Sequence, residues 1–120
     1  MVKKILVIDD EIAMRKLITA TLMLAGYVVE QASTIKEATE RLSQNDFDLI
    51  TCDFYLPEMN AAEFISQLKM DSTQFYPKIL IISGVDLNEM NQQSAADDYL
   101  SKPFRLQELK EKTMFLIGAP

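Results

Sequence analysis

The 120-residue sequence contains no histidine and only one cysteine, and both shortages restrict its chemistry. Without histidine, the chain cannot supply histidine general acid–base catalysis, a Ser-His-Asp triad or a histidine-ligated zinc site. The single cysteine, Cys52, cannot form an internal disulfide, so we expect a fold that does not depend on an oxidising compartment.

The sequence also lacks long apolar runs and an excess of positive charge. No run approaches the roughly 20 apolar residues of a membrane span, and the first residues show no signal-peptide cleavage pattern. We therefore expect a cytoplasmic protein that does not contact the membrane. The net charge of −6, from 18 acidic and 12 basic residues, argues against direct binding of nucleic acid.

Apolar residues make up 48% of the chain, which suits one domain over residues 1–120. This domain is either a whole small protein or the N-terminal part of a longer one. Short apolar runs alternate with stretches of helical spacing. Strands are expected at residues 5–8, 27–31, 47–54, 78–82 and 99–100. Helices are expected at residues 11–25, after a capping box at Thr34 and Glu37, after Asn60, weakly within 86–98, and from Pro103. This alternation predicts an α/β fold: a doubly wound five-stranded parallel sheet with helices on both faces.

Helical spacing also predicts which side chains face the core. The first helix should bury Met14, Leu17, Ile18 and Leu22, and the last helix should bury Leu106, Leu109, Thr113 and Leu116. Most of the seven methionines are interpreted as core residues. Phe104 is interpreted as a packing residue, and Cys52 as a core residue rather than a redox sensor.

Polar residues follow four of the predicted strands, at the edge where parallel sheets collect functional groups. They are Asp9 and Asp10 after the first strand, Asp53 at the third, Ser83 at the fourth and Lys102 after the fifth. Three clustered carboxylates repel one another, by about 4 kcal/mol for a pair about 4 Å apart at an effective dielectric near 20. A hard divalent cation such as Mg²⁺ would relieve this repulsion. One carboxylate could then attack phosphorus while Lys102 balances the phosphoryl charge.

Each of these signals also has an ordinary structural interpretation. An Asp-Asp pair often caps a helix, Ser-Gly is a common turn, and Lys-Pro often precedes a helix. Their order on successive strands favours the functional interpretation over the structural one.

With these residues in place, the sequence resembles the response-regulator receiver family, typified by the bacterial chemotaxis regulator. The resemblance covers essentially the whole chain and is carried by residues 4–10 (KILVIDD), 53–57 (DFYLP), 81–83 (IIS) and 97–104 (DDYLSKPF). It implies a flavodoxin-like (βα)5 fold and a phosphorylation-activated switch of a two-component phosphorelay.

The resemblance implies a role for each matching residue. Asp53 matches the phosphoacceptor, and Lys102 matches the lysine that pairs with the phosphoryl group. Ser83 and Tyr99 match the switch residues. Asp9, Asp10, Asp53 and the backbone carbonyl of Tyr55 match the ligands of Mg²⁺ or Mn²⁺. The Lys102-Pro103 bond matches one that is usually cis in the family. The phosphodonor would be a phosphohistidine on a sensor histidine kinase or phosphotransfer protein.

Two stretches depart from the family pattern. Asn60-Ala61 replaces the usual Asp-Gly, so the loop must form without a glycine that readily adopts positive φ. The span from Ser83 to Lys102 is about one helical turn shorter than usual, and residues 88–95 are polar and rich in asparagine. We therefore expect a short or irregular fourth helix and an output that differs from the chemotaxis type.

Other classes of function also fit parts of the sequence. A haloacid dehalogenase-type phosphatase uses Asp-x-Asp, but Tyr55 occupies the position of its second carboxylate. A nucleotide- or flavin-binding domain would need a Gly-rich phosphate loop where Asp9-Asp10-Glu11 stands. A pseudo-receiver would lack site residues that are all present here.

We expect a binding module that catalyses only its own phosphorylation and slow dephosphorylation, with Tyr55 screening the phosphoryl group from water. Its target is an output domain, another copy of the receiver or a separate protein.

Overall fold

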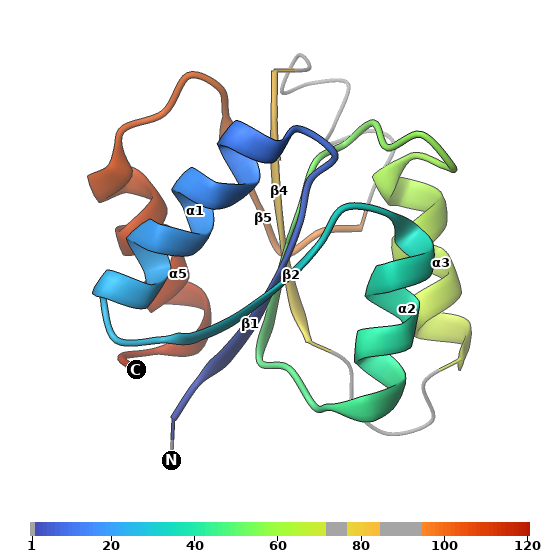
Figure 1. The fold of residues 1–120 in the computed structure, drawn as a ribbon, viewed down its shortest axis with the longest axis horizontal. Helices are drawn as coiled ribbons and strands as arrows, with labels where there is room; N and C mark the ends of the chain where they lie inside the picture. Colours follow the sequence, from blue (N-terminus) through green and yellow to red (C-terminus); the bar gives the residue numbers. More distant parts are fainter. Residues whose placement is uncertain (1, 72–76, 85–94) are drawn as a thin grey trace.

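Five parallel strands form one sheet in the computed structural model, which describes residues 2–71, 77–84 and 95–120 (Figure 1). The strands are β1 (Lys4–Ile8), β2 (Val28–Ala32), β3 (Leu49–Cys52), β4 (Lys78–Ser83) and β5 (Asp98–Ser101). Their order is β2-β1-β3-β4-β5, so the chain moves outward on one side of β1 and then crosses to the other. The predicted doubly wound parallel sheet is confirmed, and its topological switch point lies between β1 and β3.

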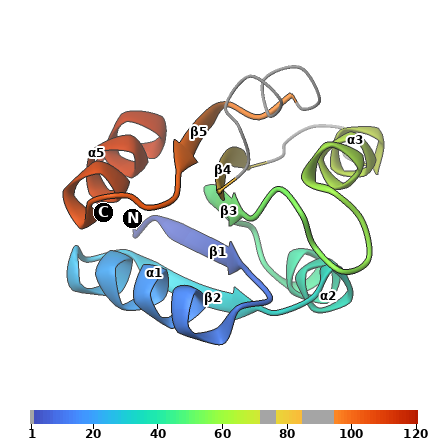
Figure 2. The same cartoon turned by 90° about the horizontal axis from the view of Figure 1, so that it is seen from above.

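In the described parts of the chain, four helices cover the two faces of the sheet: α1 (Ile12–Leu24), α2 (Ile35–Gln44), α3 (Ala61–Asp71) and α5 (Leu106–Ile117). Seen from above, α1 and α5 lie on one face, and α2 and α3 lie on the other (Figure 2). The expected fourth helix falls at residues 88–95 and lies almost wholly outside the described residues. In the parts of the chain that the structure describes, no helix is long and apolar enough to cross a membrane.

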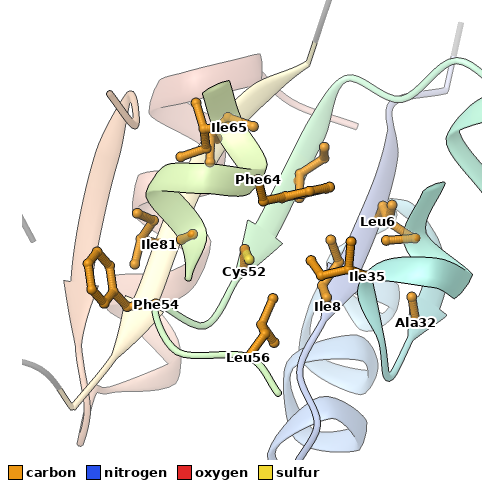
Figure 3. Close-up of a cluster of buried hydrophobic side chains, with 14 of the residues drawn as sticks. Leu6, Ile8, Ala32, Ile35, Cys52, Phe54, Leu56, Phe64, Ile65 and Ile81 are labelled. Carbon is orange, nitrogen blue, oxygen red and sulfur yellow. The ribbon is translucent and has the colours of Figure 1, made fainter. Parts of the chain in front are cut away.

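Two buried clusters hold these layers together, one on each face of the sheet. In β1, Leu6 and Ile8 contribute to one cluster, whereas Ile5 and Val7 contribute to the other, as the alternation of a strand requires. The α2/α3 cluster, drawn in Figure 3, adds side chains from α2 and α3: Ile35, Ala38, Phe64 and Ile65. The α1/α5 cluster adds side chains from α1 and α5: Ile18, Leu22 and Leu109. Because both faces are covered, β1 and β3 carry consecutive apolar residues rather than an alternating pattern, with Lys4 and Thr51 as the polar exceptions.

Several predicted boundaries and core positions are wrong. The third strand ends at Cys52 instead of continuing to residue 54, so Asp53 begins the loop. The last helix begins at Leu106, three residues after the predicted Pro103, and its first turn is closed by the Glu108 carboxylate, which accepts from the Arg105 N–H at 3.0 Å. Leu17 is 43% exposed because it lies at the margin of the buried face of α1, and Leu106 is 42% exposed because it is the first residue of α5.

The interpretation of most methionines as core residues is wrong for three of the five that the structure describes. Met23, Met70 and Met114 are exposed on α1, α3 and α5, whereas Met14 and Met59 pack partly buried against the core. The interpretation of Phe104 and Cys52 was correct: Phe104 packs against the α1/α5 cluster, and Cys52 belongs to the α2/α3 cluster.

Candidate functional site

The acidic residues lie where β1 and β3, two neighbouring strands, end side by side. The Asp9 N–H donates to the Ala32 carbonyl at 3.2 Å, and the Asp53 N–H donates to the Ile8 carbonyl at 3.3 Å. These bonds continue the sheet's ladder one residue beyond its strands. Both aspartates are therefore held by rigid backbone rather than by loop conformation.

Three carboxylates gather at this edge. One carboxylate oxygen from each of Asp9, Asp10 and Asp53 lies within 4.8 Å of the other two. Asp9 is buried, Asp53 is half-buried and Asp10 is exposed, so the cluster opens to solvent on one side. A set of hard anionic oxygens at this spacing fits the ligand preference of Mg²⁺ or Mn²⁺.

Lys102, the residue directly after β5, brings a positive charge to the cluster. Its Nζ lies 3.2 Å from Asp9 Oδ2 and 3.1 Å from Asp53 Oδ2. Its backbone N–H donates to the Ser83 carbonyl at 2.9 Å. The lysine therefore joins the ends of β1, β3, β4 and β5, as the order of the sequence signals predicted.

Burial and charge change the acidity of two of these groups. Burial raises the pKa of Asp9, and the charge of Asp53 raises it further, while the Glu11 N–H and Lys102 act in the opposite direction. Burial by itself would lower the pKa of Lys102, but the charges of Asp53 and Asp9 outweigh it, and the net pKa is raised. Lys102 thus stays charged at neutral pH, so it can balance anionic groups at this site.

The predicted switch residues lie on β4 and β5. Ser83 is 2% exposed and is the last residue of β4, in register with Ser101. Tyr99 is in register with Ile81 and packs, partly buried, against the α2/α3 cluster. Ser83 is thus placed at the acidic edge, whereas Tyr99 lies two residues before the end of β5.

The loop after Asp53 folds back on itself. The Ala61 N–H donates to the Phe54 carbonyl at 2.7 Å, and Tyr55 and Asn60 form an antiparallel bridge. Asn60 Oδ1 accepts from the Glu63 N–H at 2.9 Å, so Asn60 caps the start of α3, the helix expected after it. Among the described residues, no residue other than glycine has a positive φ. The loop therefore closes without the glycine that is usual in the family. The Tyr55 side chain is 54% exposed beside the site.

The sequence analysis missed two residues that support the site. Arg15 Nη1 donates to the Asp9 carbonyl at 2.9 Å, and Nε donates to Gln31 Oε1 at 3.3 Å. Glu58 Oε2 accepts from the Ile35 N–H at 2.8 Å. Arg15 could have been found, because helical side chains lean toward the N-terminus of their helix, and Arg15 is only the fourth residue of α1, which begins shortly after Asp9. Glu58 could not, because its partner is 23 positions away.

The resemblance also implied a cis Lys102-Pro103 bond, and the bond is cis. Cys52 is buried, and its Sγ donates to the Asp53 carbonyl at 3.2 Å. Burial and the neighbouring carboxylates strongly raise the pKa of this thiol. The thiolate form that redox chemistry needs is therefore disfavoured, in agreement with a core role.

Fold and site together define a class of α/β domain in which an acidic cluster and a lysine meet at the carboxyl edge of a doubly wound sheet. The sequence model of the response regulator receiver domain matches residues 5–114. The chain belongs to this family, and is a receiver domain of two-component signalling.

Known relatives and structures agree with this assignment. The transcriptional regulatory protein CrdR of Helicobacter pylori is 36% identical over 93% of this chain and 54% of its own length. The chain therefore spans about half the length of the curated relatives it matches. Chemotaxis response regulator CheY4 of Vibrio cholerae matches with a TM-score of 0.88 at 30% identity, over 97% of this chain and 99% of that chain. Response regulator TrrA of Thermotoga maritima, solved in complex with Mg(2+)-BeF, matches with a TM-score of 0.82 at 29% identity, over 95% and 98%.

Proposed function

We propose that Asp53 accepts a phosphoryl group from a phosphohistidine of a sensor kinase or phosphotransfer protein. The observation that carries this proposal is the Lys102 ammonium group, which bonds to both Asp9 and Asp53 at the edge where the three carboxylates meet. The half-buried Asp53 carboxylate is open enough to be approached, and its backbone is fixed by the ladder bond to β1. The absence of histidine from the chain agrees with a donor histidine on the partner.

In the transfer, an Asp53 oxygen attacks phosphorus and the bond between phosphorus and the donor nitrogen breaks. The nitrogen leaves with the electron pair, and an acyl phosphate remains on Asp53. Lys102 lies within hydrogen-bond distance of the nucleophile. Its ammonium group would bond to the phosphoryl oxygens and stabilise the negative charge that develops on them. Asp9 would remain beside Lys102 and hold its ammonium group in place.

Asp9, Asp10, Asp53 and the Tyr55 carbonyl are the groups that would hold Mg²⁺ or Mn²⁺. When bound, the cation would neutralise the clustered carboxylates and polarise the phosphoryl oxygens. The donor set supports this part of the proposal because its three carboxylates otherwise repel one another. TrrA, a relative solved with Mg(2+)-BeF, supports it too.

The response to phosphorylation would start at Ser83. Its hydroxyl would move to bond to the new phosphoryl oxygens. Tyr99 on the adjoining strand would then rotate into the space that the Ser83 hydroxyl leaves. The change would control an output domain, a separate target protein or pairing with a second copy. The match covers only 54% of CrdR, and the longer chain of this relative supports an output domain as the target. On this proposal the domain works in the cytoplasm and is no turnover enzyme, catalysing only its own phosphorylation and slow dephosphorylation.

Intact-mass measurement after incubation with Mg²⁺ and acetyl phosphate tests the central claim. Wild type should gain the mass of one phosphoryl group, and Asp53→Asn should gain none. Asp46→Asn is a matched control, because Asp46 is exposed in the loop before β3, at the other end of the sheet. A wild-type protein that stays unmodified, or an Asp53→Asn variant that gains as much, would overturn the proposal.

A further inference from the structure

Glu58 lies in the loop between β3 and α3, but its carboxylate bonds to a different element. Its Oε2 accepts a hydrogen bond of 2.8 Å from the Ile35 N–H. Ile35 is the first residue of α2, so its N–H cannot be satisfied within the helix. The carboxylate is also favoured there by the partial positive charge of the helix N-terminus. Glu58 therefore ties the loop after Asp53 to the start of α2.

The rest of this loop is a closed turn rooted at the sheet. The bond from the Ala61 N–H to the Phe54 carbonyl closes its base, and the Tyr55–Asn60 bridge stands one step above it. Nearer the tip, the Leu56 N–H donates to the Met59 carbonyl at 3.3 Å. Glu58 lies between these two residues. A bond from the tip to α2 restrains the sideways movement that bonds within the turn do not oppose.

We propose that Glu58 is a positioning residue for the metal site: by anchoring the loop tip on α2, it fixes the backbone that carries the Tyr55 carbonyl. The inference rests on the proposed function in so far as that carbonyl is taken as a metal ligand. Glu58 acts through the loop and not as a ligand. Partners that orient metal ligands typically change metal affinity by about 10- to 100-fold when they are removed.

The same helix end offers a matched control. Thr34 Oγ1 accepts from the Glu37 N–H at 3.1 Å, so Thr34→Ala removes a cap from α2 without touching the loop. Glu58→Ala removes a bond to α2 and also frees the loop. Glu58→Gln keeps an oxygen that can accept from the Ile35 N–H, but removes the charge. The three variants separate loop position, helix stability and charge.

Calorimetric titration of each variant with Mg²⁺ alone measures the relevant affinity without phosphorylation. We expect Glu58→Ala to raise the Mg²⁺ Kd about tenfold, and Thr34→Ala and Glu58→Gln to leave it close to wild type. An unchanged Kd in Glu58→Ala overturns the inference, as does a wild type that binds no Mg²⁺. An equal rise in Thr34→Ala would assign the effect to helix stability, and an equal rise in Glu58→Gln would assign it to charge, and either result also overturns the inference.

Hydrogen exchange in the metal-free proteins gives an independent readout. The amides of Leu56 and Ala61, both bonded within the loop, should exchange faster in Glu58→Ala and at the wild-type rate in Thr34→Ala. Equal rates in Glu58→Ala and wild type would count against the anchoring role. Phosphorylation is scored separately by intact mass. A wild type that takes no phosphate but loses Mg²⁺ affinity on Glu58→Ala would sink the proposed function and keep the positioning role.

Discussion

Asp10 is the exposed member of the acidic cluster, whereas Asp9 is buried beside Lys102. Three formally negative groups face one ammonium group, so without a cation the cluster carries an excess of negative charge. Lys102 balances part of this charge through Asp9 and Asp53. The remaining repulsion is a cost to the folded protein that a bound cation would remove.

Asp10→Asn should therefore stabilise the metal-free protein while weakening its response to Mg²⁺. Because Asp10 is exposed, the gain should be no more than about 1 kcal/mol in the free energy of unfolding. Urea unfolding with and without Mg²⁺ measures both effects. Wild type should gain stability as Mg²⁺ is added, and Asp10→Asn should gain much less. A variant that is less stable than wild type without metal, or equally stabilised by Mg²⁺, would contradict the prediction.

Asp46→Asn is the control for this experiment, because it removes an exposed carboxylate in the loop before β3, at the other end of the sheet from the cluster. Its response to Mg²⁺ should equal that of wild type. A loss of the Mg²⁺ response in both variants would mean that net charge, and not the cluster, attracts the cation.

At the residue scale, the sequence predicted the residues that meet but not those that hold them. Asp9, Asp53, Ser83 and Lys102 could be placed because strand order alone brings strand ends to one edge. Arg15 and Glu58 support the backbone of the site through contacts that depend on helix orientation and loop path. The Glu58 contact joins positions 23 apart, so no local pattern reveals it. The Arg15 contact joins positions only six apart at the start of a helix, and it could have been predicted.

At the element scale, α2 begins with two of its first backbone N–H groups bonded to side chains. Thr34 is its N-cap, as predicted, with extended backbone and a side chain that accepts from the Glu37 N–H. The other half of the predicted capping box differs, because the Glu37 carboxylate accepts from the Ser33 hydroxyl. The helix start is thus bonded from two directions, by Thr34 from within and by Glu58 from the loop.

Thr34→Ala should lower the free energy of unfolding by about 1 kcal/mol, because the Glu37 N–H loses its partner. Thr39→Ala is the control on the same helix. Thr39 is exposed, and its hydroxyl donates to the Ile35 carbonyl, which the helix already employs. Replacing it with alanine should be neutral or slightly stabilising, because alanine is the better helix former. Urea unfolding of both variants at neutral pH checks the prediction, and an equal loss in both would refute it.

Element types were predictable from periodicity, whereas some element ends were not. Every described strand and helix was expected, because alternating apolar runs and capping residues are local signals. The early start assigned to α5 shows the limit. Pro103 is a good first helical residue by itself, but the capping bond to Glu108 lies at Arg105. The predicted burial of Leu17 is wrong because helical spacing does not show where the buried face of a helix ends.

At the scale of the whole molecule, charge is divided between the two ends of the sheet. The carboxyl edge carries the acidic cluster, and the amino edge carries a network around Lys4. Lys4 Nζ lies 2.9 Å from Glu30 Oε2 and 5.4 Å from the centre of the Phe47 ring, and Arg41 Nη1 lies 3.2 Å from Glu30 Oε1. Hydrogen bonds and charge from Lys4, with a smaller contribution from Arg41, lower the pKa of Glu30.

Glu30 and Asp9 should therefore respond to acid in opposite ways. The pKa of Glu30 is lowered in the folded protein, so its contribution to stability is present above its ordinary value of 4.5 and is lost as the pH falls through the folded value. The pKa of Asp9 is raised, so its ionisation opposes folding, and that cost disappears on acidification. The amino edge should weaken in acid while the carboxyl edge is relieved.

Glu30→Gln separates these two effects. The variant should lose about 0.5–1 kcal/mol relative to wild type at pH 7, because the network is only partly exposed, and the difference should shrink toward zero below the folded pKa of Glu30. Urea unfolding from pH 7 down to pH 3 in metal-free buffer measures the difference at each pH. Glu40→Gln, at an exposed position of α2, is the control and should follow the wild-type curve. A Glu30→Gln deficit that stays constant across this range would show that Glu30 stabilises the fold by packing and not by its charge.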